Sequence, residues 1–169
     1  MLATRRSALV LTMAAAWPAG RALAADYPTR PIRLIVPYAP GGGADAVARV
    51  VARHVGDSLG QSIVVENRGG AGSIIGTDLV AKAEPDGYTL LLGQSGPISI
   101  NPAVYKSLPY DPAKDLVPIT MTNSYPYVLV VNAKLPANSL QEFVALGKSK
   151  PGSMNYGTTG VGAANHLMA

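Results

Sequence analysis

Apolar and polar residues along the chain follow two periods in turn. The run 32–36 (IRLIV) is apolar and rich in β-branched residues, so it predicts a largely buried strand. From 44 to 59 the apolar residues recur at helical spacing, which predicts an amphipathic helix ended by Gly60. Its expected core face consists of Val47, Val50, Val51, Val55 and Leu59, and its expected outer row of Asp45, Arg49, Arg53 and Asp57.

The same alternation continues for two more strands and one more helix. A second strand is predicted at 63–65, a second helix from 74 to about 83, and a third strand at 88–92. Strands separated by helices of about three turns pair in parallel, and helices then cover both faces of the sheet. The first part of the chain is therefore predicted to be half of a doubly wound α/β fold.

The pattern then starts again with weaker signals. Strands are predicted at 117–120, 127–131 and 154–156. Ser139 and Glu142 have the spacing of a capping box ahead of an apolar run, which predicts a helix. A last helical pattern is cut off, so we expect a truncated chain.

The N-terminus has a different pattern. Arg5 and Arg6 precede an uncharged run at 7–20, and a small-x-small triplet follows at 22–24. This arrangement is typical of a signal peptide, here residues 1–24, and the apolar run is shorter than the roughly 20 residues that span a bilayer. We expect cleavage after Ala24 and a periplasmic location, with either general or twin-arginine export.

Charge and cysteine content narrow the function classes. Three of the 14 basic residues belong to the signal peptide, so 11 basic residues remain against 10 acidic ones. No run of Lys or Arg remains that would follow a phosphate backbone, which disfavours nucleic-acid and polybasic membrane binding. The chain has no cysteine, so an exported form must be stabilised by its core.

Two glycine-rich segments, 37–45 and 157–163, each follow a predicted strand and precede a predicted helix. Free amides and the positive end of a helix dipole suit an anion, and ligands of open α/β sheets bind beyond the carboxyl ends of the strands. Tight turns also use glycine, so the local pattern leaves both interpretations open. Asp45 is interpreted as a dipole partner or as a pair for Arg49, four residues on.

A dinucleotide site is the alternative. Gly41 to Ala46 formally matches G-x-G-x-x-A after a strand, and Glu66 follows at the end of the next strand. Pro40 lengthens the turn, however, and the acidic Asp45 stands where a pyrophosphate would bind. An exported NAD-dependent oxidoreductase therefore remains the less favoured hypothesis.

No catalytic or metal site is predicted. Ser95 lacks the second glycine of a nucleophile elbow, because position 97 is proline. His166 has no Cys, Asp or Glu at metal-ligand or catalytic spacing, and His54 lies between Arg53 and Val55 in the first predicted helix, so both are interpreted as structural or solvent-facing. We expect no cofactor and no bond chemistry.

Several segments together resemble the Bug-type receptors of tripartite tricarboxylate transporters. They are, in chain order, PYAPGGGAD (37–45), VVENRGGAG (64–72), PDGYTLL (85–91), NP (101–102), YDP (110–112), NYG (155–157), GVG (160–162) and HL (166–167). The resemblance covers the whole chain after the signal peptide and about the first half of a family member. Ala44, Ala163 and Ala164 stand where many relatives carry Ser or Thr, so the ligand's identity does not carry over.

The resemblance implies a type II periplasmic-binding-protein-like α/β fold with two doubly wound lobes and a ligand cleft. The first lobe is expected at 25–104 and an incomplete second lobe at 105–169. The implied function is capture of a small carboxylate (di- or tricarboxylate, amino acid or aromatic acid) for the permease subunits of such a transporter, by a monomer. The expected ligand-binding residues are Tyr38, Pro40, Gly41, Gly42, Gly43, Ala44, Asp45, Gln94, Ser95, Thr158, Thr159, Gly160, Gly162 and Ala163.

Overall fold

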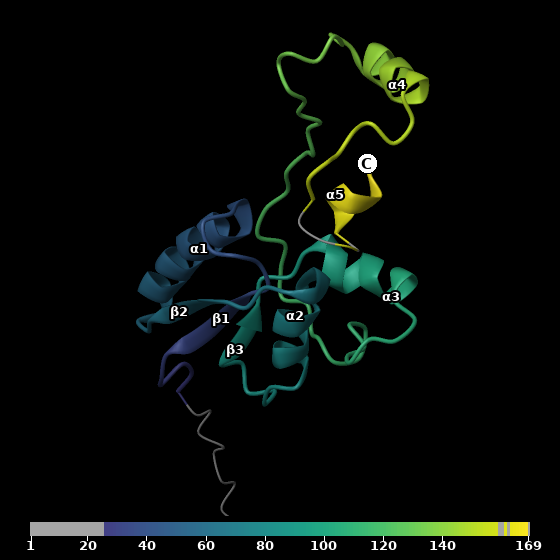
Figure 1. Cartoon of the computed structure of the whole chain (residues 1–169). Helices are drawn as coiled ribbons and strands as arrows, with labels where there is room; N and C mark the ends of the chain where they lie inside the picture. The colour runs from purple at the N-terminus through teal and green to yellow at the C-terminus, as the bar shows by residue number, and fades with distance from the viewer. Residues whose placement is uncertain (1–25, 159–160, 162, 169) are drawn as a thin grey trace, which may run out of the picture.

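The computed structural model describes residues 26–158, 161 and 163–168. The predicted signal peptide and three expected site residues, Thr159, Gly160 and Gly162, lie outside this part. The described chain forms a sheet-and-helix unit from which a long extended segment leads to two further helices (Figure 1). Within the described residues, none of the helices combines the length and the apolar character needed to cross a membrane.

The sheet has three parallel strands in the order β2-β1-β3. Strand β1 (Ile32–Val36) lies at its centre, between β2 (Ile63–Asn67) and β3 (Thr89–Leu91). The three strands of the first half are thus confirmed, as is their parallel pairing. Four of the five β1 residues are buried, as its apolar run predicts, and the exposed one is Arg33.

Helices α1 (Gly43–Leu59) and α2 (Ile74–Ala81) connect the strands and cover different parts of the sheet. Helix α1 packs on β1 and β2, whereas α2 packs on β1 and β3. The connection from β1 runs to one side of the sheet and the connection from β2 runs back past β1. Right-handed crossovers in opposite directions place the two helices on opposite faces. The α1 side holds a core cluster of Leu34, Val36, Ala48, Ala52 and Leu92.

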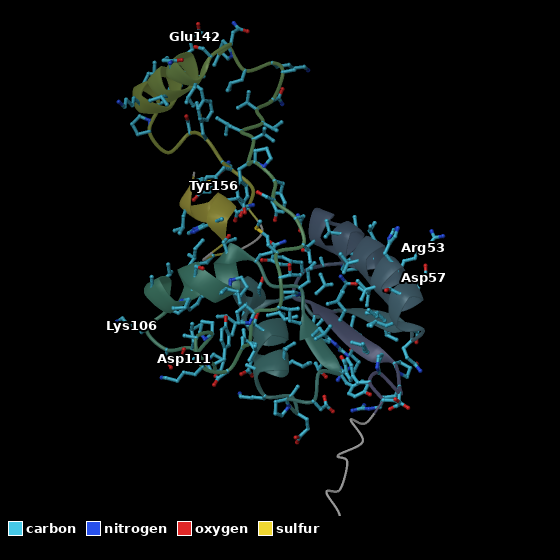
Figure 2. All side chains as sticks on the ribbon, turned by 180° about the vertical axis from the view of Figure 1, so that it is seen from behind. Arg53, Asp57, Lys106, Asp111, Glu142 and Tyr156 are labelled. Carbon is cyan, nitrogen blue, oxygen red and sulfur yellow. The ribbon has the colours of Figure 1, made fainter. Side chains whose placement is uncertain are left out.

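The predicted core face of α1 is only partly right: Val47 and Val51 are half-buried, but the other three residues are exposed. The helix buries Ala48, Ala52 and Gly56, whereas Val50 is 58% exposed and Val55 and Leu59 are also exposed. A Cβ on Gly56 would lie 3.0 Å from the Gln61 carbonyl oxygen, so the helix approaches β2 through its smallest residues. Apolar periodicity overlooks such a face because small residues carry little hydrophobic signal. Of the predicted outer row, Arg53 and Asp57 project away from the sheet (Figure 2) and Arg49 is exposed, but Asp45 is buried.

The remaining elements are short. They are η1 (Ala71–Ser73), η2 (Gly96–Ile100, a π-helix), α3 (Asn101–Val104), α4 (Leu140–Ser149) and α5 (Ala164–Leu167). The predicted cap of α4 is confirmed: the Glu142 amide donates to Ser139 Oγ at 3.2 Å. The Glu142 carboxylate in turn accepts from the Asn138 amide at 2.7 Å.

The strands predicted at 117–120, 127–131 and 154–156 do not form. All residues from 117 to 134 are exposed, including Val117 at 87% and Val130 at 82%. A strand needs a neighbour for its amides and carbonyls, and β propensity alone does not supply one. The pattern correctly identifies extended backbone but not its pairing.

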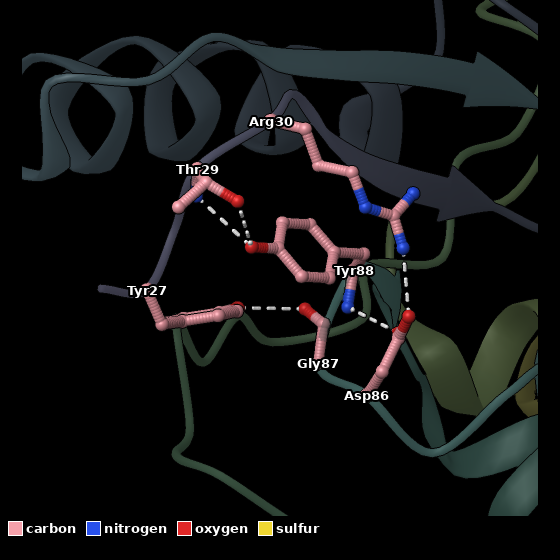
Figure 3. A network of polar contacts seen from close by, with 6 residues as sticks. All are labelled: Tyr27, Thr29, Arg30, Asp86, Gly87 and Tyr88. Atoms are coloured by element: carbon pink, nitrogen blue, oxygen red, sulfur yellow. Dashed lines mark hydrogen bonds and ion pairs between the residues drawn. The ribbon is translucent and has the colours of Figure 1, made fainter. Parts of the chain in front are cut away.

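A polar network attaches the first described residues to the turn before β3 (Figure 3). The Tyr27 hydroxyl donates to the carbonyl just before Tyr88 at 2.7 Å, and the Thr29 amide donates to the Tyr88 hydroxyl at 2.9 Å. Arg30 lies 4.0 Å above the Tyr88 ring and pairs with Asp86 at 2.7 Å. The N-terminal segment is therefore held at the amino end of the sheet, opposite the loops that follow β1 and β3.

Candidate functional site

The candidate site lies at the carboxyl ends of β1 and β3. These strands are neighbours, yet the connection from β1 leaves toward β2 on the other side. Two adjacent strands with diverging connections leave a crevice between their loops, which is where open α/β sheets bind ligands. The structure thus brings the β1 loop, 37–42, next to the β3 loop, 93–95.

Asp45 organises the β1 loop from the first turn of α1. Its side chain is buried, and Oδ2 accepts the Gly41 amide at 2.9 Å and Arg49 Nε at 3.1 Å. Arg49 Nη2 lies 3.1 Å from Oδ1, within ion-pair distance, although Oδ1 accepts no hydrogen bond from the described residues. The hydrogen bond from Arg49, followed by that from Gly41, lowers the pKa of Asp45 to about 2. Asp45 therefore has both expected roles, as an acidic residue in the first turn of the helix and as a partner of Arg49. It also accepts a hydrogen bond from the Gly41 amide of the loop.

The start of α1 stays open to an anion. The first backbone bond of α1 runs from the Ala46 amide to the Gly42 carbonyl at 3.0 Å. The amides of 43–45 therefore have no partner within the helix, at the positive end of a 17-residue dipole. Pro40, Gly41, Gly42 and Gly43 are exposed and Ala44 is half-buried, so these backbone groups are accessible.

Tyr38 lies in the same loop, two residues after the end of β1. It is half-buried and packs on the core cluster, while its carbonyl accepts from Asn67 Nδ2 at 3.3 Å. Burial raises the pKa of the Tyr38 hydroxyl, a hydrogen bond with the Ser73 side chain opposes this rise, and the nearby Tyr125 and Tyr127 add to it. The Tyr38 backbone is therefore tied to the end of β2, and its hydroxyl lies near side chains from two distant segments.

The turn from β2 to α2, residues 69–73, was not predicted as part of the site. Ala71 and Ser73 have positive φ angles of 47° and 72°, which non-glycine residues rarely adopt. Such backbone costs roughly 1–3 kcal/mol per residue and is concentrated at binding sites. A Cβ on Gly69 would lie 3.2 Å from the Tyr38 carbonyl carbon, so this turn packs against the β1 loop. The glycines at 69–72 were a signal for it.

The second glycine-rich segment touches this turn. The Val161 carbonyl accepts from the Tyr105 hydroxyl at 3.1 Å and lies 2.5 Å from where a Cβ on Gly72 would be. Asn101 Nδ2 donates to the Gly72 carbonyl at 3.0 Å and fixes the other side of the turn. Of the expected residues here, Thr158 and Ala163 are half-buried, and Ala163 caps α5.

Two of the expected ligand-binding residues lie in the β3 loop. Ser95 is exposed and Gln94 is half-buried, with its carbonyl accepting the Ile98 amide at 3.3 Å. His54 Nδ1 lies 2.9 Å from the Val50 carbonyl oxygen of its own helix, and the His54 side chain is exposed. The described residues contain no group of three His, Cys, Asp or Glu that would hold a metal ion.

Glu66 lacks the freedom that a dinucleotide site would require. Arg33 Nε lies 2.7 Å from Glu66 Oε1, and Arg68 Nη2 lies 3.1 Å from Oε2. The hydrogen bond from Arg33 lowers the pKa of Glu66 to about 2, with a smaller contribution from Arg68. The acidic residue of the dinucleotide hypothesis is thus committed to two guanidinium groups.

A depression of about 700 Å³ lies elsewhere, on the outer side of the unit between α1 and β2. Arg53, Gln61 and Ile63 are among the residues that line it. It is separate from the loops at the carboxyl ends of β1 and β3. The candidate site itself is an open surface of loop tips in the described part of the chain.

Comparison with known proteins identifies relatives of this arrangement. A family model described as "Tripartite tricarboxylate transporter family receptor" matches residues 47–169. The protein BugT of Bordetella pertussis is 48% identical over 143 residues, which cover 84% of this chain and 44% of BugT. The chain thus spans less than half the length of this curated relative.

Two solved structures are similar and hold ligands. R. palustris Rpa4515 with adipate has a TM-score of 0.79 and 35% identity, covering 83% of this chain and 47% of that one. MatC from Rhodopseudomonas palustris, with bound malate, has a TM-score of 0.69 and 36% identity, covering 73% of this chain and 42% of that one. The α/β fold predicted from the sequence is confirmed by this likeness.

Proposed function

Because this chain belongs to the receptor family of tripartite tricarboxylate transporters, we propose that it captures a small carboxylate and performs no bond chemistry. The observation that carries the proposal is the pair of loops at the carboxyl ends of β1 and β3, where the α1 amides are open to an anion. Adipate and malate in the related structures are both carboxylates.

The proposed ligand site consists of the first loop, the β3 loop and the second glycine-rich segment. The first loop binds a carboxylate through the amides of Gly43 and Ala44, with Tyr38 as an apolar lid on the ligand. Thr158 and Thr159 contribute hydroxyl donors from the second segment. In the whole receptor the two lobes, 25–104 and the part from 105 onward, close over the ligand, and the membrane permease recognises the closed form.

A thermal-shift screen tests the binding proposal. The purified chain is melted with mono-, di- and tricarboxylates, amino acids and NAD. A carboxylate that binds only the folded state raises the melting temperature in proportion to the logarithm of its concentration, whereas NAD leaves it unchanged. Stabilisation by NAD alone would overturn the proposal in favour of the oxidoreductase.

We further propose that the protein resides in the periplasm after removal of residues 1–24. The Arg5-Arg6 pair, the uncharged run and the Ala22-Leu23-Ala24 triplet support this. Fractionation followed by intact-mass measurement tests it: the periplasmic form should begin at Ala25. An uncleaved cytoplasmic chain would contradict the proposal.

A further inference from the structure

The turn 69–73 contacts both glycine-rich segments of the proposed site. At its start, a Cβ on Gly69 would lie 3.2 Å from the Tyr38 carbonyl carbon in the β1 loop. Three residues on, a Cβ on Gly72 would lie 2.5 Å from the Val161 carbonyl oxygen in the second segment. The turn reaches both backbones this closely because glycine stands at each contact. We call it the spacer turn, since it lies against one loop at its start and against the other near its end.

A tyrosine hydroxyl holds the second segment on the spacer turn. Tyr105 Oη donates to the Val161 carbonyl at 3.1 Å, and it would lie 3.0 Å from a Cβ on Gly72. The bond joins residues 56 positions apart, where the end of the described chain returns to the sheet unit (Figure 1). The Val161 carbonyl is therefore in contact with two groups of the sheet unit, a glycine backbone and a hydroxyl.

Two buried side chains keep the spacer turn in its shape. Asn101 Nδ2 donates to the Gly72 carbonyl at 3.0 Å, and Thr77 Oγ1 donates to the Ser73 carbonyl at 2.8 Å. Asn101 and Thr77 are both fully buried, so these hydrogen bonds are shielded from water and strengthened by their surroundings. A turn held in this way keeps the β1 loop and the second segment at one separation.

Resting on the proposed function, we infer that the spacer turn determines the chain length of the dicarboxylate that this protein selects. A dicarboxylate of matching length places one carboxylate at each glycine-rich segment. A shorter one reaches only one segment, and a longer one must bend to fit. Because the separation is fixed before binding, the matching ligand gains most from it. Gly72 and Tyr105 are positioning residues in this scheme, since they act on the ligand through the segment that contains Val161.

Calorimetric titration with succinate, glutarate, adipate and pimelate tests the inference, because these acids differ only in their number of methylene groups. The purified chain should bind one length roughly 10-fold more tightly than its neighbours in the series. Gly72→Ala forces the Val161 carbonyl away from the turn, so the preferred acid should become longer by at least one methylene. Tyr105→Phe removes one of the two contacts, so the preferred acid should bind roughly 2- to 10-fold more weakly and the length preference should narrow.

Two control variants separate positioning from a general loss of stability. Tyr88→Phe also removes a tyrosine hydroxyl that bonds to the backbone, but at the amino end of the sheet. Gly147→Ala adds a Cβ where no atom lies within 4 Å. Both should leave the length preference unchanged. Gly72→Ala also places alanine at a φ of 62°, so Tyr105→Phe, which introduces no backbone strain, provides the second test.

A measurement without ligand separates this inference from the proposed function. Amide hydrogen exchange in the peptide that contains Val161 should be faster in Tyr105→Phe than in Tyr88→Phe. Equal exchange in both, equal affinity of the unmodified chain for all four acids, or a length preference that neither Gly72→Ala nor Tyr105→Phe alters overturns the inference, and carboxylate binding then leaves the receptor function intact. If no carboxylate binds, the proposed function fails and the length inference fails with it, whereas faster exchange in Tyr105→Phe would still confirm the contact.

Discussion

Gly76 of α2 packs against the carboxyl ends of β1 and β2, behind the candidate site. A Cβ on this residue would lie 2.5 Å from the Arg68 carbonyl oxygen and 2.9 Å from the Cα of Pro37. Both neighbours are backbone atoms at the start of the β2 and β1 loops, so neither can rotate away. Gly76→Ala therefore forces a shift of the helix or of the loops.

Two opposing effects determine how far Gly76→Ala lowers the free energy of unfolding. Alanine is favoured over glycine in a helix interior by about 1 kcal/mol. Overpacking a close contact costs about 1–3 kcal/mol, and rigid backbone neighbours place Gly76 toward the upper end. We expect a net loss of about 1–2 kcal/mol in the free energy of unfolding. Urea unfolding followed by far-ultraviolet circular dichroism measures this loss directly.

Gly147→Ala supplies the matched control, since Gly147 also lies inside a helix but a Cβ there would have no neighbouring atom within 4 Å. Only the helix preference acts there, so α4 should gain helicity and the unfolding midpoint should not fall. If Gly76→Ala is as stable as the unmodified chain while Gly147→Ala behaves as expected, the close packing of α2 on the two loops is refuted.

Three further predictions concern charge, the N-terminal network and the extended segment. Asp45 and Glu66 have folded-state pKa values of about 2, below their ordinary values of roughly 4, so they stabilise the fold above pH about 4. The urea midpoint should fall as the pH drops from about 4 toward 2, and Glu66→Gln should flatten this dependence. Tyr88→Phe removes a hydroxyl that accepts from a backbone amide, and calorimetry should show a loss of about 1 kcal/mol. Val130→Lys should slow aggregation measured by light scattering, with an unchanged urea midpoint, because 127–131 is an exposed apolar segment of high β propensity.

The elements of the sheet unit were predictable because their apolar spacing identifies each as a strand or a helix, although it does not identify the face of α1 that packs on the sheet. The run 32–36 is apolar at nearly every position, as a central parallel strand must be, and its flanking helices carry helical spacing. The strands expected at 117–120 and 127–131 were wrong because pairing is a property of two segments. The composition of one segment indicates extended backbone and no more.

The candidate site was only partly predictable for a similar reason. Glycines after β1 identify a loop that turns into a helix, and the structure has that loop. The turn at 69–73 was missed because its distinguishing feature is the positive φ of Ala71 and Ser73, which their side chains do not favour. Contacts from Asn101 and the β1 loop hold that turn, and these contacts come from residues far apart in the sequence.

Asp45 connects the loop's shape to the charge it can accept. By taking the Gly41 amide, its carboxylate holds the β1 loop in place before any ligand arrives, which reduces the ordering cost of binding. The same carboxylate would repel an incoming anion if it were unpaired. Arg49 lies 3.1 Å from this carboxylate and removes the repulsion. The loop therefore keeps the Asp45 carboxylate inside it and still offers the Gly43 and Ala44 amides to the carboxylate of a ligand. Arg49 is therefore as necessary to the proposed site as the glycines, although it does not reach the ligand in this arrangement.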